Sequence, residues 1–195
     1  MSLREPDEAP EQFRRALEAL RATRLRPEIA LEETAAPQRL APHAVALSAD
    51  VVGEDDEELA TGRFVLLHDP AGHETWQGHF RVVTFVRAEL ELELAADPVL
   101  PSVGWSWLIE ALETRQVPYA AISGTVTRVT SEAFGSMGDR EPTAEVEMRA
   151  SWTALDSRLG PHLQAWADVL ATAAGLPPLA AGVVALPRSR GRRAH

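Results

Sequence analysis

The chain has 195 residues, of which 45% are hydrophobic, and this suits a single domain whose core is large enough to need no covalent staples. It contains no cysteine and its nineteen basic residues are all arginine, so disulfides, thiolate metal sites, Schiff-base lysines and a complete Walker A loop are excluded. The net charge of −10 argues against general nucleic-acid binding, which needs a cationic surface.

The first predicted element is a helix. Phe13, Leu17 and Leu20 follow helical spacing, Pro10 suits a first turn, and Pro27 ends the helix. After it, the sequence predicts strands at 29–33 and 43–52 and a solvated acidic loop at 54–58.

The next predicted element is a β-hairpin. The stretch DPAG at 69–72 is a turn signature, so residues 62–69 and 73–80 are expected to pair, with the two positions flanking the turn directly opposite each other. From 80 to 94, apolar residues alternate with mostly charged ones, and this period of two predicts a strand. Such a strand is too long to stay straight, so a bend is expected near 87–89.

The second half of the chain begins with a predicted helix that starts at Ser102, a suitable cap, and ends before Pro118. Trp105, Leu108 and Leu112 share its apolar face. The sequence then predicts strands at 119–131 and 143–153 and a last helix from 160 to about 174.

These elements follow the order α-β-β-β-β-α-β-β-α. Parallel strands need crossovers of a dozen or more residues, and only the central helix could supply one. The predicted fold class is therefore α+β, a single domain at 9–179 with a mainly antiparallel sheet and about three helices packed on it. Residues 1–8 are expected to be a flexible N-terminus, and 180–195 a disordered Arg-rich tail.

Three of the six histidines lie close together around the predicted turn, which raises the question of a metal or acid–base site. His68 and His73 would be direct neighbours across the hairpin, whereas His79 would lie about 20 Å from His73 along an extended strand. A zinc site needs three or four converging ligands, and neither Asp69 nor Glu74 is clearly aimed at a ring nitrogen. We therefore expect no metal, no cofactor and no catalytic residue in this hairpin or elsewhere.

The long strand and the central helix offer a candidate interaction surface instead. Val65, Leu67 and Trp76 share the hairpin face that is expected to enter the core. Trp107 points away from the stripe that buries its helix, and exposed tryptophan is typical of interface hot spots. Val83 and Phe85 lie on the otherwise charged side of the long strand, so they too are either covered by another element or available to a partner. A second element covering Trp107 is the alternative interpretation.

Several strings along the chain carry a family resemblance, among them GRFVLLHDPAG, VRAELELELAADP, VGWSWL and HLQAW. Together they make the chain similar to the actinobacterial family known as domain of unknown function 3000, from about Phe13 to Leu179. The resemblance implies a cytoplasmic actinobacterial protein. It implies no activity, substrate or catalytic residue that could be transferred.

Two functions remain open at this point. The first is a non-enzymatic, adaptor-like or chaperone-like interaction module that self-associates or holds a protein partner. The alternative is a small-molecule-binding protein or an enzyme with a pocket between sheet and helices near Trp76, Trp105 and Trp152, and with Arg63, His68 and Glu74 at its mouth.

Location and weak partners complete the expectations. The N-terminal sequence lacks the apolar segment of a signal peptide, and no apolar run is long enough to cross a bilayer, so a cytoplasmic location without membrane contact is expected. Nucleic acid is expected to bind at most weakly, through the basic residues of the tail, which are Arg188, Arg190, Arg192 and Arg193.

Overall fold

The computed structural model describes residues 9–178 except 54 and 56. The predicted flexible N-terminus and Arg-rich tail lie outside these residues. The strands are β1 (Ile29–Thr34), β2 (His43–Val52), β3 (Glu58–His73), β4 (Gly78–Leu90), β5 (Tyr119–Ser131) and β6 (Thr143–Ala154). The helices are α1 (Glu11–Ala22), α2 (Leu92–Ala96), α3 (Leu100–Thr114) and α4 (Leu159–Ala173), with short 3-10 turns η1 (Glu74–Trp76) and η2 (Gly135–Met137).

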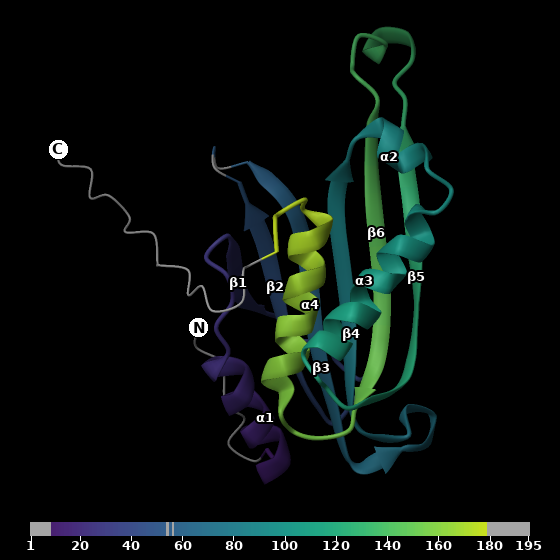
Figure 1. The fold of residues 1–195 in the computed structure, drawn as a ribbon. Helices are drawn as coiled ribbons and strands as arrows, with labels where there is room; N and C mark the ends of the chain where they lie inside the picture. The colour runs from purple at the N-terminus through teal and green to yellow at the C-terminus, as the bar shows by residue number, and fades with distance from the viewer. Residues whose placement is uncertain (1–8, 54, 56, 179–195) are drawn as a thin grey trace, which may run out of the picture.

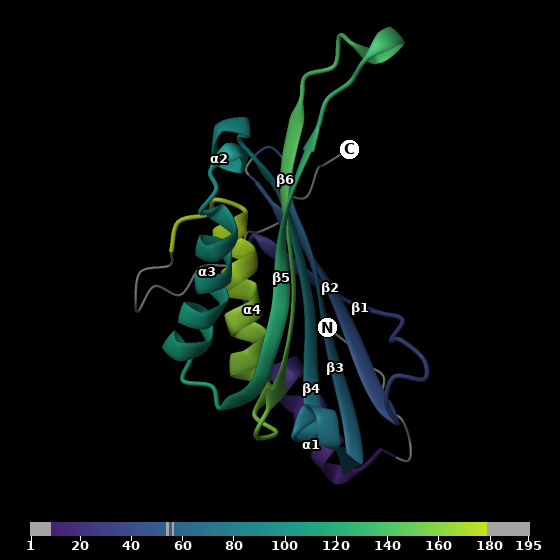
Figure 2. The same ribbon diagram turned by 90° about the vertical axis from the view of Figure 1, so that its right-hand side faces the viewer.

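The six strands form one antiparallel sheet in the order β1-β2-β3-β4-β6-β5. Helices α3 and α4 lie side by side on one face of this sheet, with α1 next to α4 (Figures 1 and 2). Figure 2 shows that no helix among the described residues covers the opposite face, which we call the open face. The predicted α+β class with a mainly antiparallel sheet is confirmed.

The hydrophobic core lies between the sheet and the helices. The alternation predicted for the long strand holds in β4, where Val82, Val86 and Ala88 are buried while Arg87 and Glu89 are exposed. From α4, Trp166 packs against Phe64 of β3 with ring centroids 5.7 Å apart. Each strand therefore turns one set of alternate side chains towards the helices and the other set towards the open face.

The predicted DPAG hairpin is wrong. In the sheet, His68 pairs with Phe80 and not with His73, and the chain reverses at η1 instead. Residues 69–72 form an irregularity within β3, in which the Ala71 N–H donates to the Asp69 side chain at 2.9 Å. The turn-forming residues of DPAG thus make a small local turn inside a longer strand. The apolar alternation of both strands sets their register.

Two further expectations change in the structure. The strand predicted to reach residue 94 ends at Leu90, and α2 follows directly. The buried face of the hairpin is also reversed, because Phe64, Leu66 and His68 join the main core. Val65 and Leu67 lie on the open face in a smaller cluster, which Trp76 and the connection from β1 to β2 cover.

Gly62 marks the closest approach of the sheet to α4. A Cβ atom at this position would lie 2.7 Å from Cζ2 of Trp166 and 3.2 Å from Cδ1 of Leu170. We expect Gly62→Ala to lower the free energy of unfolding by about 1–3 kcal/mol, because the core would have to shift to admit a methyl group.

Urea denaturation measures this loss, and Gly53→Ala is the matched control. A Cβ atom at Gly53 would lie 3.4 Å from the Leu59 side chain, which is ordinary contact. A Gly62→Ala variant as stable as the control would contradict the close approach.

Candidate functional site

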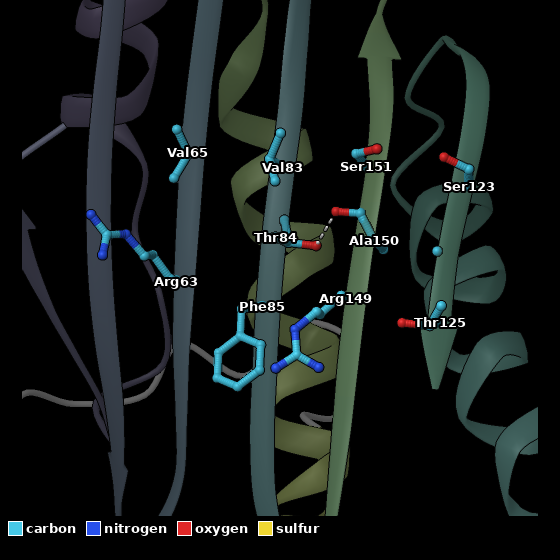
Figure 3. Close-up of a pocket in the computed structure, with 11 residues that line it drawn as sticks. Arg63, Val65, Val83, Thr84, Phe85, Ser123, Thr125, Arg149, Ala150 and Ser151 are labelled. Atoms are coloured by element: carbon cyan, nitrogen blue, oxygen red, sulfur yellow. Dashed lines mark hydrogen bonds between the residues drawn. The ribbon is translucent and has the colours of Figure 1, made fainter. Parts of the chain in front are cut away.

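A shallow groove of about 450 Å³ crosses the open face of the sheet (Figure 3). We call it the sheet-face groove. Strands β3, β4, β6 and β5 all contribute to it, so it exists only because the sheet brings these strands together. The side chains that line it on the open face are Arg63, Val65, Val83, Phe85, Ser123, Thr125, Arg149 and Ser151.

The groove contains a cation–π pair, formed by Phe85 and Arg149. Phe85 of β4 is the direct cross-strand partner of Arg149 of β6. The Arg149 guanidinium carbon lies 5.0 Å from the centroid of the Phe85 ring, which is a cation–π distance, and the same guanidinium pairs with Glu147 at 2.7 Å. Beside the ring, Val83 is 37% exposed. The floor is therefore apolar, and the guanidinium that lies over it belongs to the Arg149–Glu147 ion pair.

A second arginine stands across the groove, on β3. Arg63 is exposed and donates from Nη2 to the Ala35 carbonyl oxygen at 2.8 Å, which leaves its charge unneutralised by that contact. The lining thus carries two arginines and no acidic side chain. The Glu147 carboxylate offsets the charge of Arg149, so the groove is an apolar surface flanked by two guanidinium groups, in a chain whose net charge is −10.

Arg81 of β4 forms hydrogen bonds with β5 and β6 at one end of the groove. Its guanidinium donates to the Ala121 carbonyl at 2.8 Å, to the Ser151 hydroxyl at 2.6 Å and to the Thr153 hydroxyl at 3.2 Å. Burial lowers the pKa of Arg81 from its usual range. All three acceptors are uncharged oxygens, so this residue adds positive potential to the open face while it ties β4 to β6 and β5.

The polar groups that line the groove are hydroxyls and guanidinium groups. Ser123, Thr125 and Ser151 present hydroxyls, but a hydroxyl nucleophile needs an adjacent base, and no imidazole or carboxylate is among the lining residues. In the part of the chain that the structure describes, no group of three or more potential ligands could hold a metal ion.

The predicted interaction residues divide between the two faces. Val83 and Phe85 lie together in the groove. Trp107 lies on α3, on the helical side of the sheet, where it is half-buried against the main core. A second element therefore covers part of Trp107, and it does not share a surface with the other two.

The residues predicted at a pocket mouth are also separated. Arg63 lines the groove, whereas His68 is fully buried on the helical side. Glu74 is exposed in the η1 turn, and Trp76 stacks on His73 with ring centroids 4.7 Å apart. Trp105 and Trp152 lie on the helical side while Trp76 lies on the open face, so these three do not enclose a common pocket.

His68 and His73 lie in separate environments. His68 lies between Phe13 of α1, at 5.7 Å, and Phe80 of β4, at 4.4 Å between ring centroids, with His43 beside it at 5.9 Å. Burial, reinforced by the charges of His43 and His79, lowers the pKa of His68 to about 4 in spite of Asp69. His73 lies at the exposed turn, where its Nδ1 is 2.8 Å from the Thr75 hydroxyl. A buried, neutral His68 is a core residue here.

Arg149 and Ser151 are groove residues that sequence reasoning missed. The alternation of β6 places them on the face opposite Met148, Ala150 and Trp152, and that signal was available. The sequence could not show which strand lies next to β6, because β4 pairs with β6 although α2, α3 and β5 lie between them in the sequence. Only this pairing puts Arg149 over Phe85.

The fold and the groove define a class: an α+β protein with helices on one sheet face and a cation-rimmed apolar groove on the other. The family described as "Protein of unknown function (DUF3000)" matches residues 9–184, and the chain belongs to this family. No curated protein and no solved structure matches it. Among the described residues, no helix is long and apolar enough to span a membrane.

Proposed function

We propose that this protein is a non-enzymatic, cytoplasmic interaction module that binds an extended polypeptide segment across the sheet-face groove. The observation that carries this function is the apolar floor of Val83 and Phe85 between Arg63 and Arg149. Apolar side chains of a partner segment would cover the floor, and its carboxylates would pair with the two guanidinium groups.

The shape of the groove favours a polypeptide over a small molecule. Its volume of about 450 Å³ is within the range of small-molecule sites, but such sites enclose most of their ligand. Figure 3 shows the lining side chains standing next to one another on the sheet surface rather than surrounding a space. An extended chain laid across several strands suits this surface better.

The partner segment is expected to be both apolar and acidic. Arg149 already stacks on Phe85, so an incoming carboxylate would meet a guanidinium held in place, which lowers the ordering cost of binding. A basic segment would meet the guanidinium groups of Arg63 and Arg149, and the nearby Glu147 carboxylate is already paired with Arg149.

A labelled peptide of alternating Phe and Glu residues tests this function by fluorescence anisotropy, with a peptide in which Arg replaces Glu as its counterpart. We expect the acidic peptide to bind and the basic one not to bind. Arg149→Glu is expected to weaken binding at least about tenfold, or 1.4 kcal/mol, because it replaces attraction by repulsion.

Arg14→Glu is the matched control, since Arg14 is exposed on α1 and does not line the groove. Equal binding of the two peptides, or equal weakening by both charge reversals, would show that the groove does not select an acidic partner.

A further inference from the structure

The connection between β5 and β6 carries exposed apolar side chains far from the core. We call residues 132–142 the arm; Figure 1 shows it extending beyond the end of the sheet. Phe134 is 74% exposed and Met137 is 50% exposed, and both lie at or next to the short η2 turn. A phenylalanine and a methionine held in water at the tip of a projecting hairpin are typical of a contact made with another molecule.

The charges of the arm complement those of the sheet-face groove. The arm contains Glu132, Asp139 and Glu141 but a single basic residue, Arg140, and all four are exposed. Its tip is thus apolar with acidic flanks. The groove is apolar, with Arg63 on one side and Arg149, which pairs with Glu147, on the other. The apolar tip of the arm thus matches the apolar floor, and its acidic flanks match the guanidinium groups.

The arm lies outside the groove of its own chain. Arg149 lies six residues along β6 from Thr143, where the arm ends, and this is roughly 20 Å of extended strand. To occupy this groove, the arm would have to reverse its direction after the last β5–β6 pair, Ser131 with Thr143. Figure 2 shows the arm leaning away from α3 and α4, towards the side on which the groove opens.

We propose that the arm of one copy of this chain binds in the sheet-face groove of a second copy, with Phe134 and Met137 on the apolar floor and the acidic flanks next to Arg63 and Arg149. This inference rests on the proposed function of the groove. Each copy has one arm and one groove, so a reciprocal exchange closes a two-fold symmetric dimer.

Sedimentation equilibrium of the full chain, up to about 100 μM, tests the dimer, because micromolar association is resolved in that range. We expect wild type to dimerise. An arm variant, Phe134→Ser with Met137→Ser, and a groove variant, Val83→Asp with Arg149→Glu, are each expected to be monomeric. Leu155→Ser is the control, since Leu155 is 55% exposed but lies outside both surfaces, and it is expected to dimerise like wild type.

An equimolar mixture of the arm variant and the groove variant gives the sharper result. In the mixture, the groove variant supplies a wild-type arm and the arm variant supplies a wild-type groove, so one intact arm–groove contact can form. A heterodimer is therefore expected, although each variant alone is monomeric. Circular dichroism confirms that the variants remain folded. A monomeric wild type, or arm and groove variants that dimerise like wild type, would overturn the inference. If the dimer fails but the acidic Phe–Glu peptide still binds, the proposed function of the groove stands. If the peptide does not bind either, both the dimer and the proposed function are overturned.

Discussion

Lowering the pH from neutral to about 4.5 should cost the protein roughly 3–5 kcal/mol of its free energy of unfolding, because two buried histidines must stay neutral in the folded state. Burial lowers the pKa of His68 to about 4 and that of His162 to about 4, from an ordinary value of 6.5. For His162, the nearby Asp156 opposes this effect and Arg158 adds to it.

The sign follows from proton binding. Between about pH 4 and 6.5 the unfolded chain binds protons at these two positions and the folded chain does not. The stabilising contribution is therefore complete above pH 6.5 and is lost as the pH falls towards 4, with a slope of up to about 1.4 kcal/mol per pH unit for each histidine. The hydrogen bond and ion pair with Arg87 lower the pKa of the Glu145 carboxyl from its ordinary value.

Structural contacts support the neutral state of both rings. The Nδ1 atom of His162 accepts a hydrogen bond from Nε1–H of Trp152 at 2.9 Å, which requires that Nδ1 carries no proton. His68 is fully buried between Phe13 and Phe80, and neither of its ring nitrogens has a hydrogen-bond partner among the described residues. A charge on either ring would be buried without compensation.

The variant His68→Phe isolates one of the two contributions. A phenyl ring can stack between the same two neighbours, so the free energy of unfolding at neutral pH is expected to be maintained or to rise. The loss of stability on acidification is expected to fall to about half. Urea denaturation at a series of pH values measures both quantities. A variant that keeps the full pH dependence of wild type would contradict the assignment of His68 as a neutral core residue.

The parts of the fold that the sequence predicted are those with a strong local period. In β4, Val82, Val86 and Ala88 alternate with exposed residues, and the strand has the predicted faces up to Leu90. In α4, the stripe of Leu163, Trp166 and Leu170 is buried as expected. In β4 one set of alternate side chains faces the helices, so hydrophobic periodicity alone determines its orientation. α4 packs against α1, α3 and the sheet, so most of its residues are buried, and the stripe is only part of its buried surface.

The parts that the sequence did not predict depend on contacts between distant segments. DPAG is a good turn sequence, but the pairing of Phe64 with Thr84 and of Leu66 with Val82 fixes a register that places it inside β3. The groove likewise depends on the order of strands in the sheet, which no local pattern encodes. Val83 and Phe85 could be singled out as unusual, whereas their neighbour Arg149 could not.

Trp166→Ala is expected to lower the free energy of unfolding by about 3–5 kcal/mol, a large share of the total stability of a domain of this size. Trp166 is 1% exposed and packs on Gly62 and Phe64. Its indole Nε1–H also donates to the backbone carbonyl of Phe85 at 3.2 Å. Removing the side chain would leave a cavity at the centre of the contact between α4 and the sheet, and urea denaturation measures the loss.

The variant Trp166→Phe tests the indole apart from the aromatic contact with the core. This variant keeps an aromatic ring and loses the hydrogen bond to Phe85, so a smaller loss of about 1–2 kcal/mol is expected. Phenylalanine has no atom in the place of the indole Cζ2, the atom that a Cβ at Gly62 would approach to 2.7 Å. The cost of Gly62→Ala should therefore shrink by about 1 kcal/mol in the Trp166→Phe background, a coupling that a double-mutant cycle measures. Strictly additive losses would show that the indole does not set the distance between α4 and β3.

Binding of the Phe–Glu peptide to the Trp166→Phe variant should stay within about twofold of wild type. The Phe85 side chain lies in the groove, on the face of the sheet opposite to Trp166.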